Sequence, residues 1–466
     1  MNASNDLAAL FEKAQLLAQA GLDEEAKRAY VAVLERDSTH FGALTGIAGL
    51  ALATGYRSAA LTAYRQAVAC HPNNPFGLVN LANLLLEDDD LGEARRLYER
   101  ALAIDSRLAF AHQGLASVLA KQGDEEGAAR HREQGFAGHS IVVRPYRGTG
   151  TPLAVLLIVS AKGGNIPTNI ILDDRIFAVT ALYAEFHDAA QPLPAHDIVF
   201  NAVGDADLCG SILDEVAKIV ARSRAPVINR PDLIRNTGRS ANAERLAGLP
   251  DMVVPHTALV PRALCDEPKK IVQFGFHFPL LLRSPGFHTG RNFVRVENPD
   301  ALSAAAAGLP GEDLLVIEYF DVCGPDGMAR KYRVMFIDGK LYPLHLALSQ
   351  SWKVHYFTSA MAENTEFRRE EELFLNDMEA ALGSRAISGL EQLRDALALD
   401  YGGADFALTS DGRLLLFEAN ATMAIVPPMP DPIWDYRRPS ITRAIEATRG
   451  ILLGRAGMNP SRNPGT

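Results

Sequence analysis

The pattern of apolar positions divides the chain into a helical first part and a mixed second part. Across residues 1–136, small residues recur at a long constant interval, which is typical of stacked helix pairs. In the second part, short apolar runs alternate with amphipathic stretches. Residues 153–159, 197–203 and 226–229 are predicted strands, and residues 213–221 are a predicted helix between the last two. Farther along the chain, residues 363–382 are a predicted amphipathic helix. This strand–helix–strand order predicts a parallel sheet covered on both faces.

Residues of the same type return every 34 positions in the first part. Small residues at a constant position let two helices approach closely, tyrosines fill the gap beneath them, and glycine supplies the turn. The positions are Ala14, Ala48, Ala82 and Ala116; Ala26, Ala60, Ala94 and Ala128; Tyr30, Tyr64 and Tyr98; and, at the turn, Gly21, Gly55, Asp89 and Gly123. The pattern resembles the tetratricopeptide repeat, with three full repeats and part of a fourth. The resemblance implies a concave surface for a peptide or protein partner. Self-association, or support of a neighbouring domain, is the alternative.

The composition of the chain argues against several classes of binding partner. A chain of 466 residues with a net charge of −10 and no basic block is not expected to bind nucleic acid. Cys70, Cys209, Cys265 and Cys323 form no CxxC pair, so neither a disulfide framework nor a zinc site is indicated. The sequence has no basic-then-apolar leader and no apolar run near about 20 residues, so we expect a cytoplasmic protein without a membrane partner.

The main candidate for chemistry is a hairpin predicted within residues 401–423. Two apolar runs flank residues 410–412, which have the composition of a tight turn. Such a hairpin brings Asp405 close to Glu418 and Asn420, and the last two share a face because they are two positions apart. Two carboxylates and an amide oxygen form the kind of site that Mg²⁺ prefers when it also holds nucleotide phosphates. An ordinary solvated hairpin is the alternative.

Further segments of the second part carry candidate ligand-binding residues. A predicted strand delivers Arg283 to a glycine-containing loop at residues 284–292, whose backbone N–H groups could fold over phosphates. A flexible hairpin tip with surface arginines is the alternative. At the ends of the predicted parallel strands, Gly163-Gly164 and Asn201 are also candidates, although a plain turn is the favoured reading of the two glycines.

The order of these segments resembles the ATP-grasp superfamily of carboxylate–amine ligases, in the branch of the glutathione synthetases and ribosomal-protein glutamate ligases. The resemblance covers roughly residues 151–450. It is carried by Asp405 followed by Glu418-Ala419-Asn420, by LLVIEYF at residues 314–320, and by FPLLLRSPGFHTGRNFVRV at residues 278–296. It implies that the chain uses ATP and Mg²⁺.

The resemblance also implies roles for individual residues. Magnesium is held by Asp405, Glu418 and Asn420. Arg333 and Lys353 act at the reacting groups. His345 or His355 could relay a proton, although a structural histidine is the favoured reading of each. The nucleotide-binding residues that the resemblance implies are Arg239, Arg283, Thr289, Gly290, Glu318, Tyr319, Phe320 and Lys331.

Three places in the chain depart from the family pattern. Arg239 and Arg283 stand where phosphate-binding lysines are usual, and residues 402–404 (Gly-Gly-Ala) stand where a basic residue often precedes the first magnesium aspartate. The implied function is formation of an amide bond through an acyl phosphate, from carboxylate and amine substrates such as amino acids or peptides. A non-catalytic nucleotide-binding adaptor and an ATP-dependent kinase are the alternatives. A homodimer is left open.

The sequence therefore predicts an α/β (α+β) ATP-grasp domain preceded by an all-α repeat solenoid. The expected boundaries are 1–136 for the repeat domain, 137–151 for a linker, 152–230 for a parallel α/β subdomain, 231–455 for the catalytic domain and 456–466 for a disordered tail.

Overall fold

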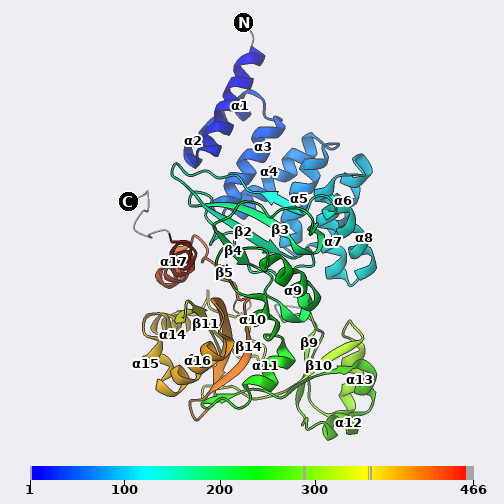
Figure 1. Cartoon of the computed structure of the whole chain (residues 1–466), viewed down its shortest axis with the longest axis vertical. Coiled ribbons are helices and arrows are strands. Elements are labelled where there is room, and N and C mark those ends of the chain that lie inside the picture. The colour runs from blue at the N-terminus through cyan, green and yellow to red at the C-terminus, as the bar shows by residue number, and fades with distance from the viewer. Residues whose placement is uncertain (1–2, 287–289, 355, 357–358, 458–466) are drawn as a thin grey trace. The chain divides into compact units, whose positions relative to one another are not determined.

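The computed structural model describes residues 3–286, 290–354, 356 and 359–457 (Figure 1). The chain forms two compact units. Unit 1 comprises Met1–Ala154 and Asp173–Pro192, and unit 2 comprises Val155–Leu172 and Leu193–Thr466.

Unit 1 opens with a run of helices that pack in sequence, each against the next. Its described residues contain four helix pairs, coloured from blue to cyan in Figure 1, so the fourth repeat is a complete pair rather than a part. The helices are α1 (Ala3–Gln19), α2 (Asp23–Arg36), α3 (Phe41–Ala53), α4 (Arg57–Cys70), α5 (Pro75–Glu87), α6 (Leu91–Ile104), α7 (Ala109–Gln122) and α8 (Glu125–Phe136).

The residues of the 34-residue pattern occupy the places predicted for them. All eight repeated alanines are buried, and so are Tyr30, Tyr64 and Tyr98. The turn between the two helices of each pair has a left-handed residue in every repeat, because glycine, and less often aspartate, tolerates a positive φ. These residues are Gly21, Gly55, Asp89 and Gly123, with φ of 71°, 84°, 62° and 86°.

A second small position supports the tyrosines. A Cβ atom at Gly46 would lie 2.5 Å from Cζ of Tyr30, and one at Gly114 would overlap the ring of Tyr98. In both cases the glycine follows its tyrosine by 16 residues and belongs to the next helix pair. The tyrosine ring therefore packs directly on the backbone of the following repeat, which couples neighbouring repeats.

The predicted linker is partly ordered into a strand. Within residues 137–151, β1 (Ile141–Val143) pairs antiparallel with β3 (Phe177–Tyr183), and a 3-10 helix, η1 (Ala184–Phe186), follows β3. The β-branched run Ile-Val-Val favours a strand despite the surrounding glycines. Phe136 at the end of α8 packs on Tyr183 and Phe186, with ring centroids 4.4 and 5.5 Å apart.

Unit 2 contains three groups of strands. β2 (Leu153–Val159, most of which lies in unit 2), β4 (Ile198–Asn201) and β5 (Val227–Ile228) pair in parallel, as predicted. A four-stranded antiparallel sheet has the order β7-β10-β8-β9, and a five-stranded sheet has the order β12-β11-β13-β14-β6. Their strands are β6 (Met252–Val253), β7 (Thr257–Pro261), β8 (Leu280–Arg283), β9 (Phe293–Val296), β10 (Asp313–Glu318), β11 (Ala329–Ile337), β12 (Lys340–Ser349), β13 (Tyr401–Leu408) and β14 (Leu414–Asn420).

Helices pack against these sheets. α14 and α17 lie against β12, α16 lies against β14, and α11 contacts both β7 and β14. The helices of unit 2 are α9 (Ala206–Val220), α10 (Pro231–Arg235), α11 (Arg239–Leu246), α12 (Pro268–Gln273), α13 (Leu302–Ala307), α14 (Thr365–Asn376), α15 (Met378–Leu382), α16 (Ser384–Leu397) and α17 (Arg438–Arg455). The final 3-10 helix is η5 (Pro432–Arg437).

Polar caps explain where two helices differ from the pattern-based prediction. α9 begins seven residues before the predicted start at residue 213, because Asp205 caps it by accepting the N–H groups of Asp207 and Leu208. The single helix predicted over residues 363–382 is broken at Asp377. There φ is −142°, and the side chain caps α15 through the Ala380 N–H at 3.0 Å.

We expect Gly114→Ala to lower the free energy of unfolding by about 1–3 kcal/mol. The new methyl overlaps the ring of Tyr98, which is fully buried and donates a hydrogen bond to Asn83, and such overpacking outweighs the gain in helix propensity. Gly49→Ala in α3 is the matched control, because nothing lies within 4 Å of its Cβ position. The control should be neutral or more stable by up to about 1 kcal/mol in urea unfolding. Equal effects of the two substitutions would contradict the packing role of Gly114.

A histidine pair joins the last two helices of the array. Nδ1 of His112 lies 2.7 Å from Nδ1 of His131, and Nε2 of His112 lies 3.1 Å from the carbonyl oxygen of Ser106. Because that carbonyl can only accept, the Nε2 proton is on His112, and His131 donates between the two rings. Burial, followed by the charge of His112, lowers the pKa of His131.

The lowered pKa of His131 makes the stability of unit 1 pH-dependent. The folded state binds fewer protons than the unfolded chain, so the stabilisation is present above pH about 6.5 and is lost as the pH falls through the lower folded pKa. We expect unfolding midpoints measured from pH 8 to pH 5 to fall more steeply for the wild type than for His131→Gln. Parallel curves for the two proteins would contradict this assignment.

Candidate functional site

The register of three adjacent strands places four of the predicted site residues on one sheet face. Asp405 on β13 pairs opposite Glu418 on β14, and Gly403 pairs opposite Asn420. On the other side of β13, Arg333 on β11 pairs opposite Asp405. Residues directly opposite one another on neighbouring strands point to the same face. The predicted hairpin and the shared face of its three oxygen-bearing side chains are therefore present.

Asp405 is a buried carboxylate held by two cations. Arg333 donates from Nε to Oδ1 at 2.6 Å and from Nη2 to Oδ2 at 2.9 Å, and Lys331 donates from Nζ to Oδ2 at 3.0 Å. Only 3% of Asp405 is exposed. Burial alone would raise the pKa of Asp405, but Arg333 and Lys331 outweigh burial and hold it well below its usual range. The carboxylate is therefore ionised throughout the physiological range.

Glu418 has its own cation from a distant part of the chain. Nη2 of Arg239 lies 2.5 Å from Oε1 of Glu418, and Nδ2 of Asn420 donates to the same oxygen at 2.9 Å. Oδ1 of Asn420 accepts from the N–H and hydroxyl of Thr422 at 3.0 and 2.9 Å. The amide oxygen of Asn420 thus faces Thr422 rather than the carboxylates.

The donor set fits a hard cation in type, with one rearrangement. Asp405 and Glu418 supply carboxylate oxygens from one face, which Mg²⁺ prefers, but the amide of Asn420 must turn to offer its oxygen. Among the described residues, no group of three or more His, Cys, Asp or Glu side chains converges as a metal site. The candidate set does not count as such a group, because it consists of two carboxylates and one amide.

Arg283 lies close to the Arg239–Glu418 pair. Burial, followed by the positive charge of Arg239, lowers the pKa of Arg283 to about 10, while Glu418, Asp205 and Asp207 oppose this shift. The two arginines that replace the expected lysines are therefore near enough to sense each other's charge. Two neighbouring guanidinium groups favour binding of an anionic ligand.

Lys353 belongs to the segment after β12 and reaches the loop that connects β8 and β9. Its Nζ donates to the carbonyl oxygen of Phe293 at 3.2 Å. Gly290 has a φ of 72°, and a Cβ atom there would lie 2.7 Å from Cε of Lys353. Burial, followed by the charge of Arg283, lowers the pKa of Lys353. Two other predicted residues, Thr289 and His355, lie outside the described residues.

Glu318 and Tyr319 are placed at the end of β10, away from the carboxylates. The Glu318 N–H donates to the carbonyl of His256 at 2.9 Å, and its carboxylate accepts the His256 N–H at 3.2 Å. The Tyr319 ring lies under Arg295, 4.4 Å from the guanidinium carbon, and edge-on to Trp352. Phe320 follows the strand and is half-buried. Through its contact with Trp352, Tyr319 meets the segment that carries Lys353.

His345 extends the row of opposed residues by one strand. It lies on β12 opposite Arg333, it is buried, and its Nδ1 has no hydrogen-bond partner among the residues that the structure describes. Burial, followed by the charge of Arg333, lowers the pKa of His345 well below its usual value, so the ring is neutral. The ring packs on Tyr356 at 4.8 Å between centroids.

Asn201 and the two glycines have structural roles. Asn201 donates to the carbonyl of Asn229 at 2.9 Å and accepts the Val203 N–H at 3.1 Å, so both ends of its side chain are used within the fold. Gly164 has a φ of 66°, and a Cβ atom there would lie 2.8 Å from the Cβ of Asp205. The glycine pair is a close-packed turn against the start of α9.

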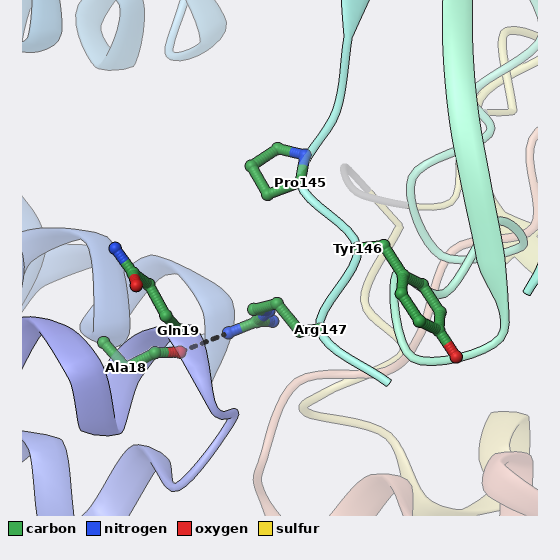
Figure 2. Close-up of a pocket in the computed structure, with 5 residues that line it drawn as sticks. All are labelled: Ala18, Gln19, Pro145, Tyr146 and Arg147. Atoms are coloured by element: carbon green, nitrogen blue, oxygen red, sulfur yellow. Dashed lines mark hydrogen bonds between the residues drawn. The ribbon is translucent and has the colours of Figure 1, made fainter. Parts of the chain in front are cut away.

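A pocket of about 440 Å³ lies in unit 1, lined by Ala18, Gln19, Pro145, Tyr146 and Arg147 (Figure 2). Its charged side chain is already engaged, since Arg147 donates to the carbonyl of Ala18 at 3.2 Å, drawn as a dashed line in Figure 2, and to Asp174 at 2.9 Å. The residues that line this pocket include no acid–base pair. The candidate site therefore remains the sheet face of unit 2 that carries Asp405 and Glu418.

Comparison with known proteins supports the repeat assignment. Residues 63–96 match the family model described as a tetratricopeptide repeat. The chain is similar to MamA from Desulfovibrio magneticus RS-1 (23% identity, 28% of this chain and 75% of that one, TM-score 0.26) and to a thermophilic tetratricopeptide protein of Thermus thermophilus (19%, 28% and 73%, 0.26). The search of curated proteins gave no match.

The findings define a class of protein in two parts. An array of helix pairs with a tetratricopeptide repeat at residues 63–96 is followed by a mixed α/β region. Repeats of this class generally bind protein partners. None of the helices in the described parts of the chain combines the length and apolarity that crossing a bilayer needs.

We expect Asp405→Ala to lower the free energy of unfolding by about 3–5 kcal/mol, because it leaves Arg333 without its anionic partner in a mostly buried setting. Glu366→Ala, which breaks an exposed pair with Arg369, should cost less than about 1 kcal/mol. Denaturant unfolding of both variants measures the difference. A loss at Asp405 no larger than the loss at Glu366 would show that the Asp405 cluster is not a buried ion-pair network.

Proposed function

We propose that unit 2 is an ATP- and Mg²⁺-dependent ligase of the ATP-grasp type, which joins a carboxylate to an amine through an acyl phosphate. The observation that carries this proposal is the row of Asp405 and Glu418, opposed across two strands and bracketed by the cations Arg333 and Arg239. The similarity of the sequence to ATP-grasp ligases in the order of its segments supports the same reading.

The cations around the row suit a polyanionic ligand. Lys331, Arg333 and Arg239 neutralise the two carboxylates. When Asp405 and Glu418 hold Mg²⁺, these cations become available for phosphate oxygens. Bound Mg²⁺ supplies neutralisation of the negative charge on the β- and γ-phosphates. Arg239 and Arg283 would then hold phosphates, as guanidinium groups bind such oxygens in a bidentate manner.

The reaction itself requires positioning and exclusion of water. The substrate carboxylate would attack the γ-phosphorus, breaking its bond to the bridging oxygen, so that ADP leaves and an acyl phosphate forms. The amine would then attack the acyl carbon, expelling phosphate and losing a proton, which leaves an amide. Arg333, which lies opposite Asp405, would act at the reacting groups, and Lys353, which contacts Phe293 and approaches Gly290, would act from the side of the loop that follows Arg283. Closure of that loop over the nucleotide would keep water from the acyl phosphate. Orientation and electrostatics supply the rate enhancement, with no protein nucleophile.

The repeats of unit 1 have a role in recruitment in this proposal. Their class binds peptides or proteins, so the carboxylate, the amine or both would be delivered on a peptide or protein partner. An adaptor that binds nucleotide without turnover and a kinase that transfers phosphate to an alcohol are the competing functions.

ADP release from the full chain separates these functions. With ATP, Mg²⁺ and mixed amino acids or peptides, a ligase requires both a carboxylate and an amine, a kinase responds to an alcohol alone, and an adaptor gives no turnover. We expect Glu418→Gln to reduce turnover by at least about 100-fold through lost electrostatic stabilisation, whereas Glu366→Gln retains wild-type rates. Asp405→Asn should also be inactive, assayed at a temperature where it is folded. Full activity in Glu418→Gln would refute the assignment.

A further inference from the structure

The first turn of α9 approaches several parts of the candidate site at once. A Cβ atom at Gly204 would lie 3.0 Å from Cγ2 of Thr422, next to the end of β14. A Cβ atom at Gly286, in the loop after Arg283, would lie 3.9 Å from Cδ1 of Leu208. Between these two contacts is Asp207, the second carboxylate of an Asp-x-Asp sequence at residues 205–207.

Asp207 meets the beginning of α11, the helix that carries Arg239. The Arg239 N–H lies 3.1 Å from Oδ2 and 3.3 Å from Oδ1 of Asp207. The residue before α11 is Gly238, which has no side chain with which to cap the helix. A Cβ atom at Gly238 would lie 2.5 Å from Oδ1 of Asp207, so the approach requires glycine. The carboxylate of one helix therefore supplies the cap that another helix lacks.

Asp205 and Asp207 cap different helices. Asp205 accepts the N–H groups of Asp207 and Leu208 and so caps its own helix. Asp207 is left to act on α11. The side chain of the residue it anchors, Arg239, then reaches Glu418 at 2.5 Å. The contact of Asp207 with the Arg239 N–H thus fixes the backbone of Arg239, whose guanidinium group contacts Glu418.

We propose that Asp207 is a positioning residue, which caps α11 and thereby sets the guanidinium of Arg239 at the nucleotide site. The role of Asp207 at a nucleotide rests on the proposed function, whereas its capping of α11 is independent of that function. The parallel α/β region, through α9, would in this way control phosphate binding by a residue that touches no phosphate.

Titration calorimetry with Mg²⁺–ADP on the full chain tests the positioning role. We expect Asp207→Ala to weaken binding about fivefold, as loss of a helix cap of about 1 kcal/mol predicts. Asp207→Asn keeps an oxygen that accepts the Arg239 N–H and should stay within about twofold of wild type. Gly238→Ala, which displaces Asp207, should reproduce Asp207→Ala. The matched control is Asp377→Ala, which removes the cap of α15 and should leave the affinity unchanged.

A double-mutant cycle shows whether Asp207 acts through Arg239. In an Arg239→Ala background, Asp207→Ala should cause no further loss of affinity. An equal fivefold loss in that background would overturn the proposal, because the effect would then not depend on Arg239.

Amide hydrogen exchange without nucleotide tests the cap independently of function. Exchange over residues 239–246 should be faster in Asp207→Ala than in wild type or Asp377→Ala. Unchanged exchange there overturns the proposal. If the wild-type chain binds no Mg²⁺–ADP, the proposed function fails and Asp207 has no role at a nucleotide, while faster exchange would still establish the cap.

Discussion

The central constraint in unit 2 is the buried contact of Asp405 with Arg333 and Lys331. Removing three charged groups from water is costly, and a buried ion pair is on average no more stabilising than apolar side chains of similar volume. Stability alone therefore does not account for this cluster. A site that must bind a cation and a polyanion in turn does need ionised carboxylates, kept in place by cations that can change partners.

Strand register turns this local contact into a site. Because opposed residues share a face, pairing of β12, β11, β13 and β14 aligns His345, Arg333, Asp405 and Glu418. A slip of one residue in any pair would send one member to the opposite face. The five-stranded and four-stranded sheets then contribute differently: the first carries the carboxylates, and the second carries Arg283 and the loop that Lys353 approaches at Gly290.

The sequence predicts what is local or periodic. The 34-residue spacing predicts the helix pairs, their left-handed turns and their buried tyrosines, and alternation with a tight turn predicts the hairpin of Asp405 and Glu418. The glycines on which Tyr30 and Tyr98 pack also follow their tyrosines at a fixed offset of 16 residues, but the 34-residue pattern alone does not indicate this contact.

Long-range pairing is what the sequence leaves open. Glu418 takes its cation from Arg239, 179 residues earlier, and no local pattern specifies that partner. The sequence does not predict the role of Asp207 either, because a carboxylate in the first turn of a helix ordinarily interacts with its own helix. The feature that could indicate this contact belongs to α11. This helix begins after a glycine, which has no side chain to cap it, and so requires a cap from another part of the chain. β1 was missed because glycines on either side of Ile141–Val143 indicated a linker.

The measurement that most directly tests the account is calorimetric titration of ADP into the full-length chain, with Mg²⁺ and then with EDTA. The account predicts tight binding that depends on Mg²⁺, since Asp405 and Glu418 would bind the nucleotide only through the cation. Equal affinity with and without Mg²⁺, or no binding in either case, would contradict it.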